Sequence, residues 1–528
     1  MEHMEQRIFV NSKGASHVKI SRPERPEMNF NTADIIFAFV MLACGFLYWN
    51  LLDLFMLGAG VTIFAIVLFT ASFVYLSKSG VKQNTKSLIC LVLAALSTVQ
   101  FVLFDNGFIS FLNLQFLMGL FIYWICLSTG RQLDQKLSIY IIGDAFKQVI
   151  NIPFKNFSCC FVGAKKGFSK QKKGKGFLAG LIGILIFLPA LAIVVNLLVS
   201  ADLAFEIFVG RIIDWLNAVN VIHYIWQFII GIPVAFYLYG LIYGNVKGRY
   251  DGNITSQSVD CAAQAVKIAP RITIYSALTA FNVIYLVFFA VQAGYLFSAF
   301  TANLPETFTY AEYARRGFFE LCAVAGINLG ILAVAHLTVK KEMGEEPKLL
   351  KIQTLLISLF TILLIATALS KMIMYINVYG LTQLRVFTSW FMILLFFVFA
   401  IICVRQFKKF NSTRGMIVAF VVLFMVLSYG NVDGLIARYN IERYEAGTLQ
   451  MLDVHALERL SDAAIPPLYD LYLKTDDEEM RERLALAFTH RRASTDFRGF
   501  NVQRHRANEI REKFIIKIME SMEAGNQR

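Results

Sequence analysis

Eleven long apolar runs are the feature that most constrains how this 528-residue chain can fold. A helix needs about 20 mostly apolar residues to cross the hydrocarbon core of a bilayer, and each run is near that length. Their approximate limits are 33–52, 55–77, 87–104, 110–128, 177–199, 221–244, 272–299, 317–339, 352–370, 386–404 and 415–431. The expected fold class is therefore all-α, a polytopic transmembrane helix bundle.

Composition supports a membrane protein over a soluble one. Hydrophobic residues make up 57% of the chain, charged residues only 16%, and the mean hydropathy is +0.57. That leaves too little polar surface to cover a soluble globule. The net charge of +13 does not indicate nucleic-acid binding, because the basic residues lie between apolar runs and not in a basic soluble domain.

The distribution of lysine and arginine predicts the topology. From the N-terminus onward, the connecting segments carry 5, 0, 3, 0, 10, 1, 4, 2, 4, 2 and 4 of these residues. Positively charged loops stay cytoplasmic. We therefore expect residues 1–32 to be a cytoplasmic segment, 33–431 a transmembrane domain, and 432–528 an extracytoplasmic helical tail.

Two connecting segments are expected to lie in the membrane interface. The stretch "LSIYIIGDAFKQVINIPF" (137–154) is too interrupted to span and suits an amphipathic helix, as does 201–219, where Trp215 would be a headgroup anchor. After the first comes "AKKGFSKQKKGKG" (164–176), which lacks the order of a phosphate-binding loop. It is either a topology determinant or a site that attracts anionic lipid headgroups, at about 1 kcal/mol per basic residue; the two roles are compatible.

The tail changes composition abruptly and predicts short helices. Thr475 and Glu478 have the spacing of a capping box, and Pro466 and Pro467 suit the first turn of another helix. The last helix is expected to bury an apolar stripe of Ile510, Phe514, Ile515 and Ile518.

Three stretches on the predicted outer side combine charge with tyrosine. They are "TYAEYARRGFFE" (309–320), "KMIMYINVYGLTQLR" (371–385) and "ARYNIERYEAG" (437–447). At helical spacing, Glu312, Arg316 and Glu320 form one ridge, Lys371, Tyr375 and Tyr379 repeat that spacing, and Arg438 pairs with Glu442. Gly380 is placed to end a helix before Thr382 caps the tenth span.

These stretches have two interpretations. Tyrosine and arginine anchor helices at the bilayer edge, but charges near hydrocarbon also mark ligand sites, and clustered arginines recognise phosphate or carboxylate. The candidate ligand-binding residues are Tyr310, Glu312, Tyr313, Arg315, Arg316, Glu320, Lys371, Tyr375, Tyr379, Arg385, Arg438, Tyr439, Glu442 and Arg443.

The same stretches carry a family resemblance. "TYAEYARRGFFEL", "YINVYGLTQLR" and "ARYNIERY" resemble signature stretches of the bacterial membrane family known as domain of unknown function 4153, and of its relative 4173. The patterns YGLT-x-LR and YAEY-x-RRGF carry the similarity. The resemblance implies a bacterial plasma-membrane protein and supplies no catalytic or binding residues.

Known catalytic and cofactor motifs do not appear in the sequence. Cys159 and Cys160 lack the spacing of a zinc site, and His223 and His336 lie in apolar runs, where a structural role is the default. No catalytic residue, metal or cofactor is therefore assigned. The uncharged polar residues within the spans are expected to join helices by hydrogen bonds; they are Asn196, Asn282, Gln292 and Asn328.

Three functions remain open from the sequence. The first is envelope-related transport or the handling of a lipid or other anionic ligand at the extracytoplasmic face. The second is a sensor or assembly scaffold that recruits an envelope partner through the tail. The third, an intramembrane enzyme, has neither a nucleophile nor a metal motif to support it.

Overall fold

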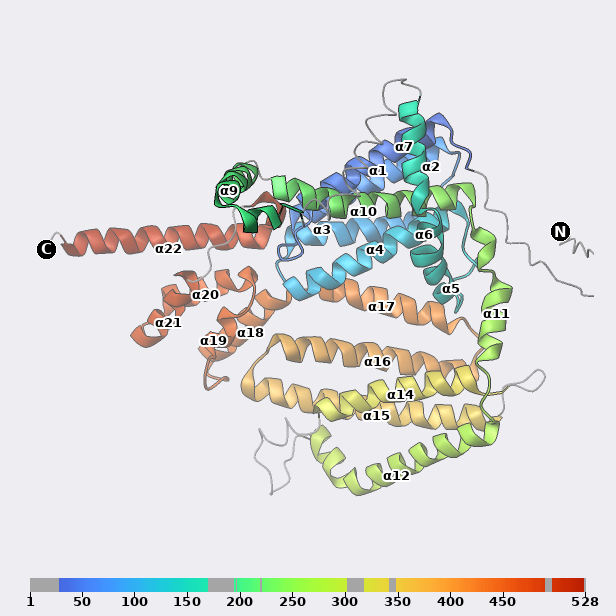
Figure 1. Cartoon of the computed structure of the whole chain (residues 1–528). Coiled ribbons are helices and arrows are strands. Elements are labelled where there is room, and N and C mark those ends of the chain that lie inside the picture. The colour runs from blue at the N-terminus through green and yellow to red at the C-terminus, as the bar shows by residue number, and fades with distance from the viewer. Residues whose placement is uncertain are drawn as a thin grey trace, which may run out of the picture.

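The computed structural model describes residues 28–169, 194–195, 197–218, 221–301, 318–340, 348–489 and 496–526. Helices and no named strands make up the regular structure of these residues (Figure 1). Ten of the helices are long and apolar enough to cross a membrane. They match ten of the eleven predicted runs, and most of the remaining run, 177–199, lies outside the described residues. The chain is thus an all-α, multi-pass membrane protein.

Five spans form a first bundle, in which α1 packs closely against α10. The spans are α1 (Thr32–Leu51), α2 (Ala59–Lys78), α3 (Thr85–Leu103), α4 (Gly107–Thr129) and α10 (Val221–Lys247). Where α1 crosses α10, a Cβ added to Gly231 would lie 2.6 Å from the carbonyl oxygen of Gly45. Small residues at such a crossing let two helix backbones approach in a membrane, where van der Waals packing drives association.

Four spans form a second bundle with its own apolar core. They are α12 (Arg271–Thr301), α14 (Phe318–Thr338), α15 (Lys348–Tyr379) and α16 (Gln383–Phe407). Buried Asn328 of α14 accepts a hydrogen bond from Tyr285 of α12 and donates one to Thr361 of α15 at 2.8 Å. The predicted helix-joining role of Asn328 is confirmed. The last span, α17 (Ser412–Tyr429), packs on α16 and also contacts α3 and α4 of the first bundle.

Short helices run across the spans at one end of the molecule (Figure 1). These are α5 (Ile141–Phe146), the π-helix η1 (Lys147–Asn151), α6 (Ile152–Lys155) and α7 (Phe157–Ser169), with α11 (Ser256–Ala265) joining the two bundles. The predicted amphipathic segment 137–154 is helical from Ile141 onward. Its polar residues Asp144, Lys147 and Gln148 are buried, while Ile142 and Phe146 are exposed. Its polar face therefore packs into the protein.

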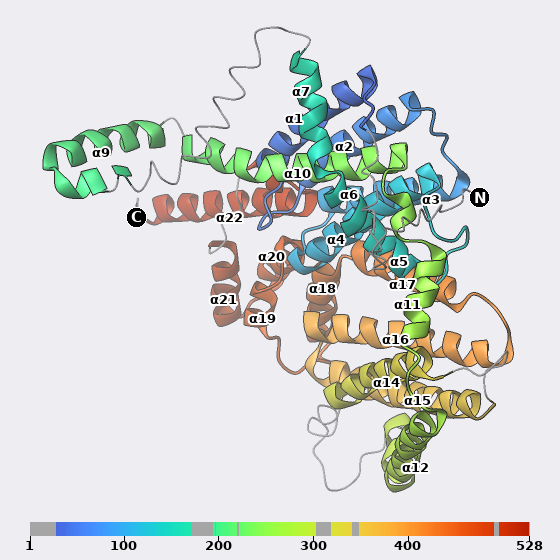
Figure 2. The ribbon, with the colours of Figure 1, turned by 45° about the vertical axis from the view of Figure 1, so that its right-hand side comes forward.

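The tail lies at the other end of the spans, where its core includes residues of the membrane region (Figure 2). It comprises α18 (Val432–Glu445), α19 (Val454–Glu458), η3 (Asp462–Ala464), α20 (Ile465–Lys474), α21 (Glu478–Thr489), η4 (Phe497–Gly499) and α22 (Val502–Asn526). Ile109 of α4 and Leu427 of α17 belong to the apolar core of the tail, and Trp390 of α16 packs against it. The tail is therefore joined to both bundles. We call this end of the molecule the tail end and the other the opposite end.

One detail at the start of the tail helices agrees with the prediction, and one differs. Pro466 and Pro467 lie in the first turn of α20, as predicted. Thr475, however, ends α20, and Asp477 caps α21 by accepting the backbone N–H of Glu479 at 3.0 Å. Several adjacent polar side chains could cap α21, and the structure uses Asp477 where the sequence had suggested Thr475.

The predicted apolar stripe of the last helix is only half buried. Phe514 is buried and Ile510 packs against the tail core, whereas Ile515 and Ile518 are exposed. The outer part of α22 extends beyond the other tail helices (Figure 1), which agrees with the exposure of Ile515 and Ile518.

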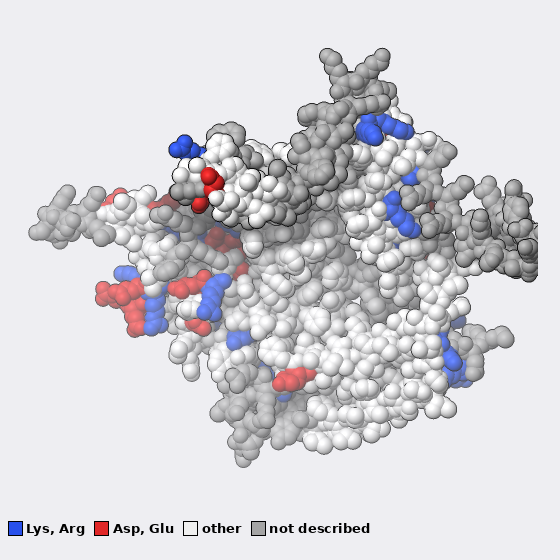
Figure 3. Space-filling model, in the orientation of Figure 1, with Lys and Arg blue, Asp and Glu red and all other residues white. Residues whose placement is uncertain are grey.

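The second predicted interfacial helix forms at the tail end. It is α9 (Leu203–Ala218), which lies beside the N-terminal part of α10 (Figure 2). The side chain of Trp215 lies outside the described part of the chain, so its anchoring role stays a prediction. On the face drawn in Figure 3, charged side chains gather over the tail and over the opposite end, with a largely uncharged band between them. That pattern suits a protein whose middle lies in lipid.

Candidate functional site

The three predicted stretches are only partly described. Residues 309–317, which include Tyr310, Glu312, Tyr313, Arg315 and Arg316, lie outside the described residues. Glu320 lies in the first turn of α14, Lys371, Tyr375 and Tyr379 lie in the last part of α15, and the third stretch is the body of α18. All described members therefore belong to the tail end.

The second stretch contains the end of α15 and the turn to α16, and the predicted helix end and helix cap are confirmed. Gly380 ends α15 with φ +74°, a left-handed conformation that favours glycine. Thr382 then caps α16 by accepting the backbone N–H of Arg385. The Arg385 side chain folds back over this turn, where its Nη1 donates to the carbonyl oxygens of Tyr379 and Gly380.

Arg385 is thus a cation at the C-terminus of α15. Its guanidinium lies 4.2 Å from the ring centroid of Tyr375 and 6.0 Å from that of Tyr379. The two tyrosine rings pack edge to face at 5.0 Å. A cation is favoured both by the helix macrodipole at this position and by the ring faces. Among the residues described, Arg385 has no carboxylate partner.

The third stretch contacts the second directly. Arg443 donates to the carbonyl oxygens of Ile376 at 3.2 Å and Asn377 at 2.8 Å, so it also caps the end of α15. The Asn440 side chain accepts the N–H of Leu381 at 2.7 Å and donates to its carbonyl at 2.9 Å. The structure therefore brings residues 371–385 and 437–447 together.

Other predicted pairs within these stretches have mixed outcomes. Tyr439 and Arg443 do share one stripe of α18, with the guanidinium 5.7 Å from the ring centroid. Arg438 is exposed, and no ion pair joins it to Glu442 within the described part of the chain. Lys371 is half-buried in α15, and the charge of Glu320 acts on it. This last pair links the described end of the first stretch to the second.

A groove of about 780 Å³ separates the α15–α16 turn from the tail. One wall holds Tyr379, Thr382 and Arg385, while Asn440 of α18 and the segment from Leu449 to Ala456 contribute the other. Arg483 and Leu486 of α21 also line it. The lining mixes aliphatic side chains with two arginines and two carboxylates, Asp453 and Glu458. The apolar surface and the two cations suit a ligand that has an apolar part and an anionic part.

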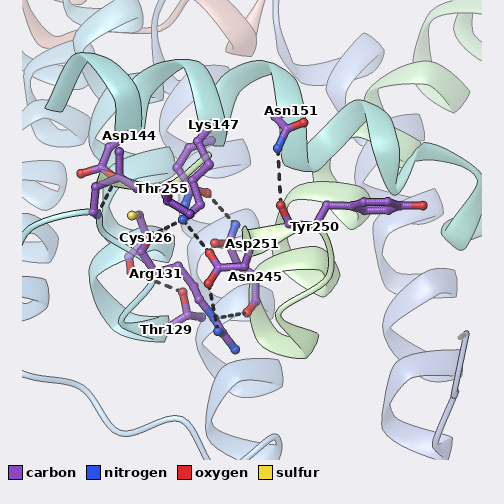
Figure 4. A network of polar contacts seen from close by, with 12 residues as sticks. Cys126, Thr129, Arg131, Asp144, Lys147, Asn151, Asn245, Tyr250, Asp251 and Thr255 are labelled. Atoms are coloured by element: carbon purple, nitrogen blue, oxygen red, sulfur yellow. Dashed lines mark hydrogen bonds and ion pairs between the residues drawn. The ribbon is translucent and has the colours of Figure 1, made fainter. Parts of the chain in front are cut away.

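The opposite end holds a charge network around one buried lysine, which the sequence reasoning missed (Figure 4). Lys147, only 3% exposed, forms an ion pair with Asp251 at 2.6 Å and donates to the carbonyl of Arg131. Arg131 pairs with the same Asp251 at 3.2 Å. The network joins the segment after α4, the π-helix η1 and the segment after α10. π-Helical turns are common at functional sites. In η1, however, Lys147 is already paired with the carboxylate of Asp251.

Asp144 lies beside this network, and no cation of the described segments forms a hydrogen bond with it. It accepts the backbone N–H of Leu133 at 2.8 Å. Burial raises the pKa of the Asp144 carboxyl above its ordinary value, and the Leu133 N–H and the charge of Lys147 oppose that shift.

A second buried ion pair lies at the start of α1. Asp34, 0% exposed, accepts hydrogen bonds from Tyr75 of α2 at 2.8 Å and from the Asn31 backbone, and it pairs with Lys247 of α10 at 2.9 Å. It therefore ties three spans together. The available signal was an acid at the second position of an apolar run, three residues after an asparagine that caps the helix.

Comparison with known proteins gives a family and nothing closer. No curated protein and no solved structure matches the chain. The model of the family described as domain of unknown function (DUF4153) matches residues 88–471, which is well over half of the 528 residues. The match starts in α3, ends in α20 and covers the sequence of all three stretches. The chain belongs to the DUF4153 family.

Proposed function

We propose that this multi-pass membrane protein binds an anionic amphiphile, such as a lipid with a phosphate or carboxylate headgroup, in the groove at the tail end. The observation that carries the proposal is Arg385. It lines the groove, lies over Tyr375 and lacks a carboxylate partner among the described residues. A guanidinium with free donors beside an apolar surface is suited to an anionic headgroup.

The proposal places the groove on the extracytoplasmic side, as the lysine and arginine distribution predicts. Its position at the ends of α15 and α16 would let a lipid of the outer leaflet reach it from the bilayer. Envelope-related lipid handling or transport is the activity that such a site would serve. In the second wall, Arg483 adds a cation whose only carboxylate partner among the described residues is Glu479, on the same exposed helix face.

Binding of a defined lipid to the purified full chain tests the proposal. We expect short-chain phosphatidylglycerol to raise the unfolding temperature of the detergent-solubilised protein more than phosphatidylcholine of the same chain length, because only bound ligand stabilises the fold by mass action. Arg483→Ala should reduce the difference, whereas Lys513→Ala, which removes an exposed cation of α22, should not. Equal shifts with both lipids would contradict an anion-binding groove.

The scaffold hypothesis has a separate observation in its favour. The outer part of α22 exposes Ile515, Ile516, Ile518 and Met519, and exposed apolar residues of this kind mark surfaces that bind other proteins. Under this alternative, Ile515→Glu should abolish co-purification of a partner from membranes, while Lys513→Glu should preserve it. Lipid-dependent stabilisation that survives Ile515→Glu would separate the two functions.

A further inference from the structure

A buried carboxylate with uncharged partners lies where the two bundles and the tail meet. Asp433, 1% exposed, is in the first turn of α18. It accepts hydrogen bonds from Asn106 Nδ2 at 2.9 Å and Gln383 Nε2 at 2.7 Å. It also accepts the backbone N–H of Ser461 at 3.1 Å.

The three donors come from three different parts of the protein. Asn106 belongs to the turn between α3 and α4 in the first bundle, and Gln383 is the first residue of α16 in the second. Ser461 lies in the tail, directly before η3. All three are neutral, so directional hydrogen bonds and not an ion pair hold the carboxylate in the described structure.

The surroundings of this carboxylate differ from those of two other carboxylates near the junction. Asp105 pairs with Arg504 of α22 at 2.6 Å, and Asp462 pairs with Arg511 at 2.6 Å. The first of these ion pairs attaches the tail to the first bundle, and the second lies within the tail. Asp433, in contrast, accepts hydrogen bonds from residues of both bundles.

The junction reaches into the first bundle through further polar groups. A space of about 10 Å³ beside Asp433 is also lined by Gln100 and Ser428, both buried. Its size and polar lining suit one water molecule. Gln100 in turn accepts a hydrogen bond from Asn113 of α4 at 2.8 Å.

We propose that Asp433 is a shared joint that transmits displacement of either bundle to α18. Helix α18 also carries Asn440 and Arg443, which fix the α15–α16 turn on one wall of the groove. Movement of the first bundle would thus change the groove without any direct contact between them. The proposed role of Asp433 does not depend on which ligand the groove binds.

Hydrogen–deuterium exchange of the purified full chain tests the joint without any ligand. We expect Asn106→Ala to speed exchange several-fold in the N-terminal turns of both α18 and α16, although the mutation lies in the first bundle. Gln383→Ala should likewise speed exchange in α18 and at the start of α4. Asp470→Ala, which alters an exposed tail acid, is the matched control and should leave these segments unchanged.

The double variant separates a shared joint from two independent attachments. If both donors act through Asp433, the exchange increase in α18 for Asn106→Ala with Gln383→Ala should fall short of the product of the single effects. Increases that multiply, or that stay within the bundle that carries the mutation, would overturn the proposal. Gln383→Ala removes one hydrogen bond, whereas Asn106→Ala removes two, because the Asn106 side chain also accepts the backbone N–H of Ile109 as the cap of α4. Both variants are expected to remain folded.

Discussion

The two ends of the membrane region use charge in different ways. At the opposite end, Asp34 and Asp251 are paired with Lys247, Lys147 and Arg131, so the buried charges satisfy one another. At the tail end, Arg504 and Arg511 of the tail form ion pairs, whereas Arg385 and Arg443 donate to backbone carbonyls at the end of α15. Buried ion pairs leave little capacity for a ligand, whereas a guanidinium on carbonyls keeps its positive charge uncompensated.

This contrast explains why we assign the ligand to the tail end. A carboxylate already placed between two cations competes with any incoming anion at the opposite end. The groove beside Arg385 has space and an apolar surface as well. The opposite end is better understood as the clamp that holds α1, α2, α10 and the crossing helices in place.

The largest expected effect concerns which end faces outward. Met451, 83% exposed, lines the groove, and Cys261, which is exposed, lies in α11 at the opposite end. In intact cells, a membrane-impermeant maleimide should label Met451→Cys, and the native Cys261 should react only after lysis. The reversed pattern would place the groove in the cytoplasm and remove the outer leaflet as a source of ligand.

The next effect tests the clamp at the opposite end. Asp34→Ala leaves Lys247 without its partner and removes the acceptor for Tyr75, so we expect a loss of about 3–5 kcal/mol of unfolding free energy. Asp53→Ala, beyond the other end of α1, should cost only about 1 kcal/mol because it removes one exposed hydrogen bond. Thermal unfolding in detergent measures both. Equal losses would mean that the buried pair has no special structural role.

A smaller effect is expected where arginine caps the end of α15. Lysine cannot reach the carbonyls of both Ile376 and Asn377 as a planar guanidinium does, so Arg443→Lys should cost about 1–2 kcal/mol. The exposed neighbour on the same helix, Arg438→Lys, should change stability by less than about 0.5 kcal/mol. If Arg443→Lys behaves like that control, the cap is not stabilising and Arg443 is free for another role.

The smallest effect is a pH dependence at the opposite end. Since burial raises the pKa of Asp144, the folded protein binds its proton more readily than the unfolded chain, and the charged form weakens the fold near neutral pH. Asp144→Asn keeps an acceptor for the Leu133 N–H, so it should raise the unfolding temperature at neutral pH. That gain should shrink as the pH falls through the folded pKa. The nearby charges are Lys147, Asp134 and Asp251. A gain independent of pH would contradict this assignment.

The spans and the turn from α15 to α16 could be predicted from the sequence because local signals define them. Apolar length identifies a spanning helix, and Gly380 and Thr382 are local end signals. The same locality explains why the correct acid for the cap of α21 was missed. Several adjacent acids can serve there, and only the packed structure selects Asp477.

The charge networks could not be predicted because they join residues far apart in the sequence. Asp34 meets Lys247, and Asp433 meets Asn106, only once the helices are packed. The orientation of the segment 137–154 could not be predicted either, since an amphipathic pattern does not show whether the polar face points to water or into the protein. The tail-end stretches could be recognised without a fold, because tyrosine and charge beside apolar runs are visible in the sequence; their ligand-binding role stays a prediction. The hydrogen bonds by which Arg385 and Arg443 cap the end of α15 could not be predicted.

Protection of the groove by a lipid is the most direct test of the account. The rate at which a maleimide reacts with Met451→Cys should be measured on the purified protein with phosphatidylglycerol or with phosphatidylcholine of the same chain length. We predict that only phosphatidylglycerol slows the reaction, and that Arg385→Gln abolishes this protection. Equal protection by both lipids, or by neither, would contradict an anionic ligand in the groove at the tail end.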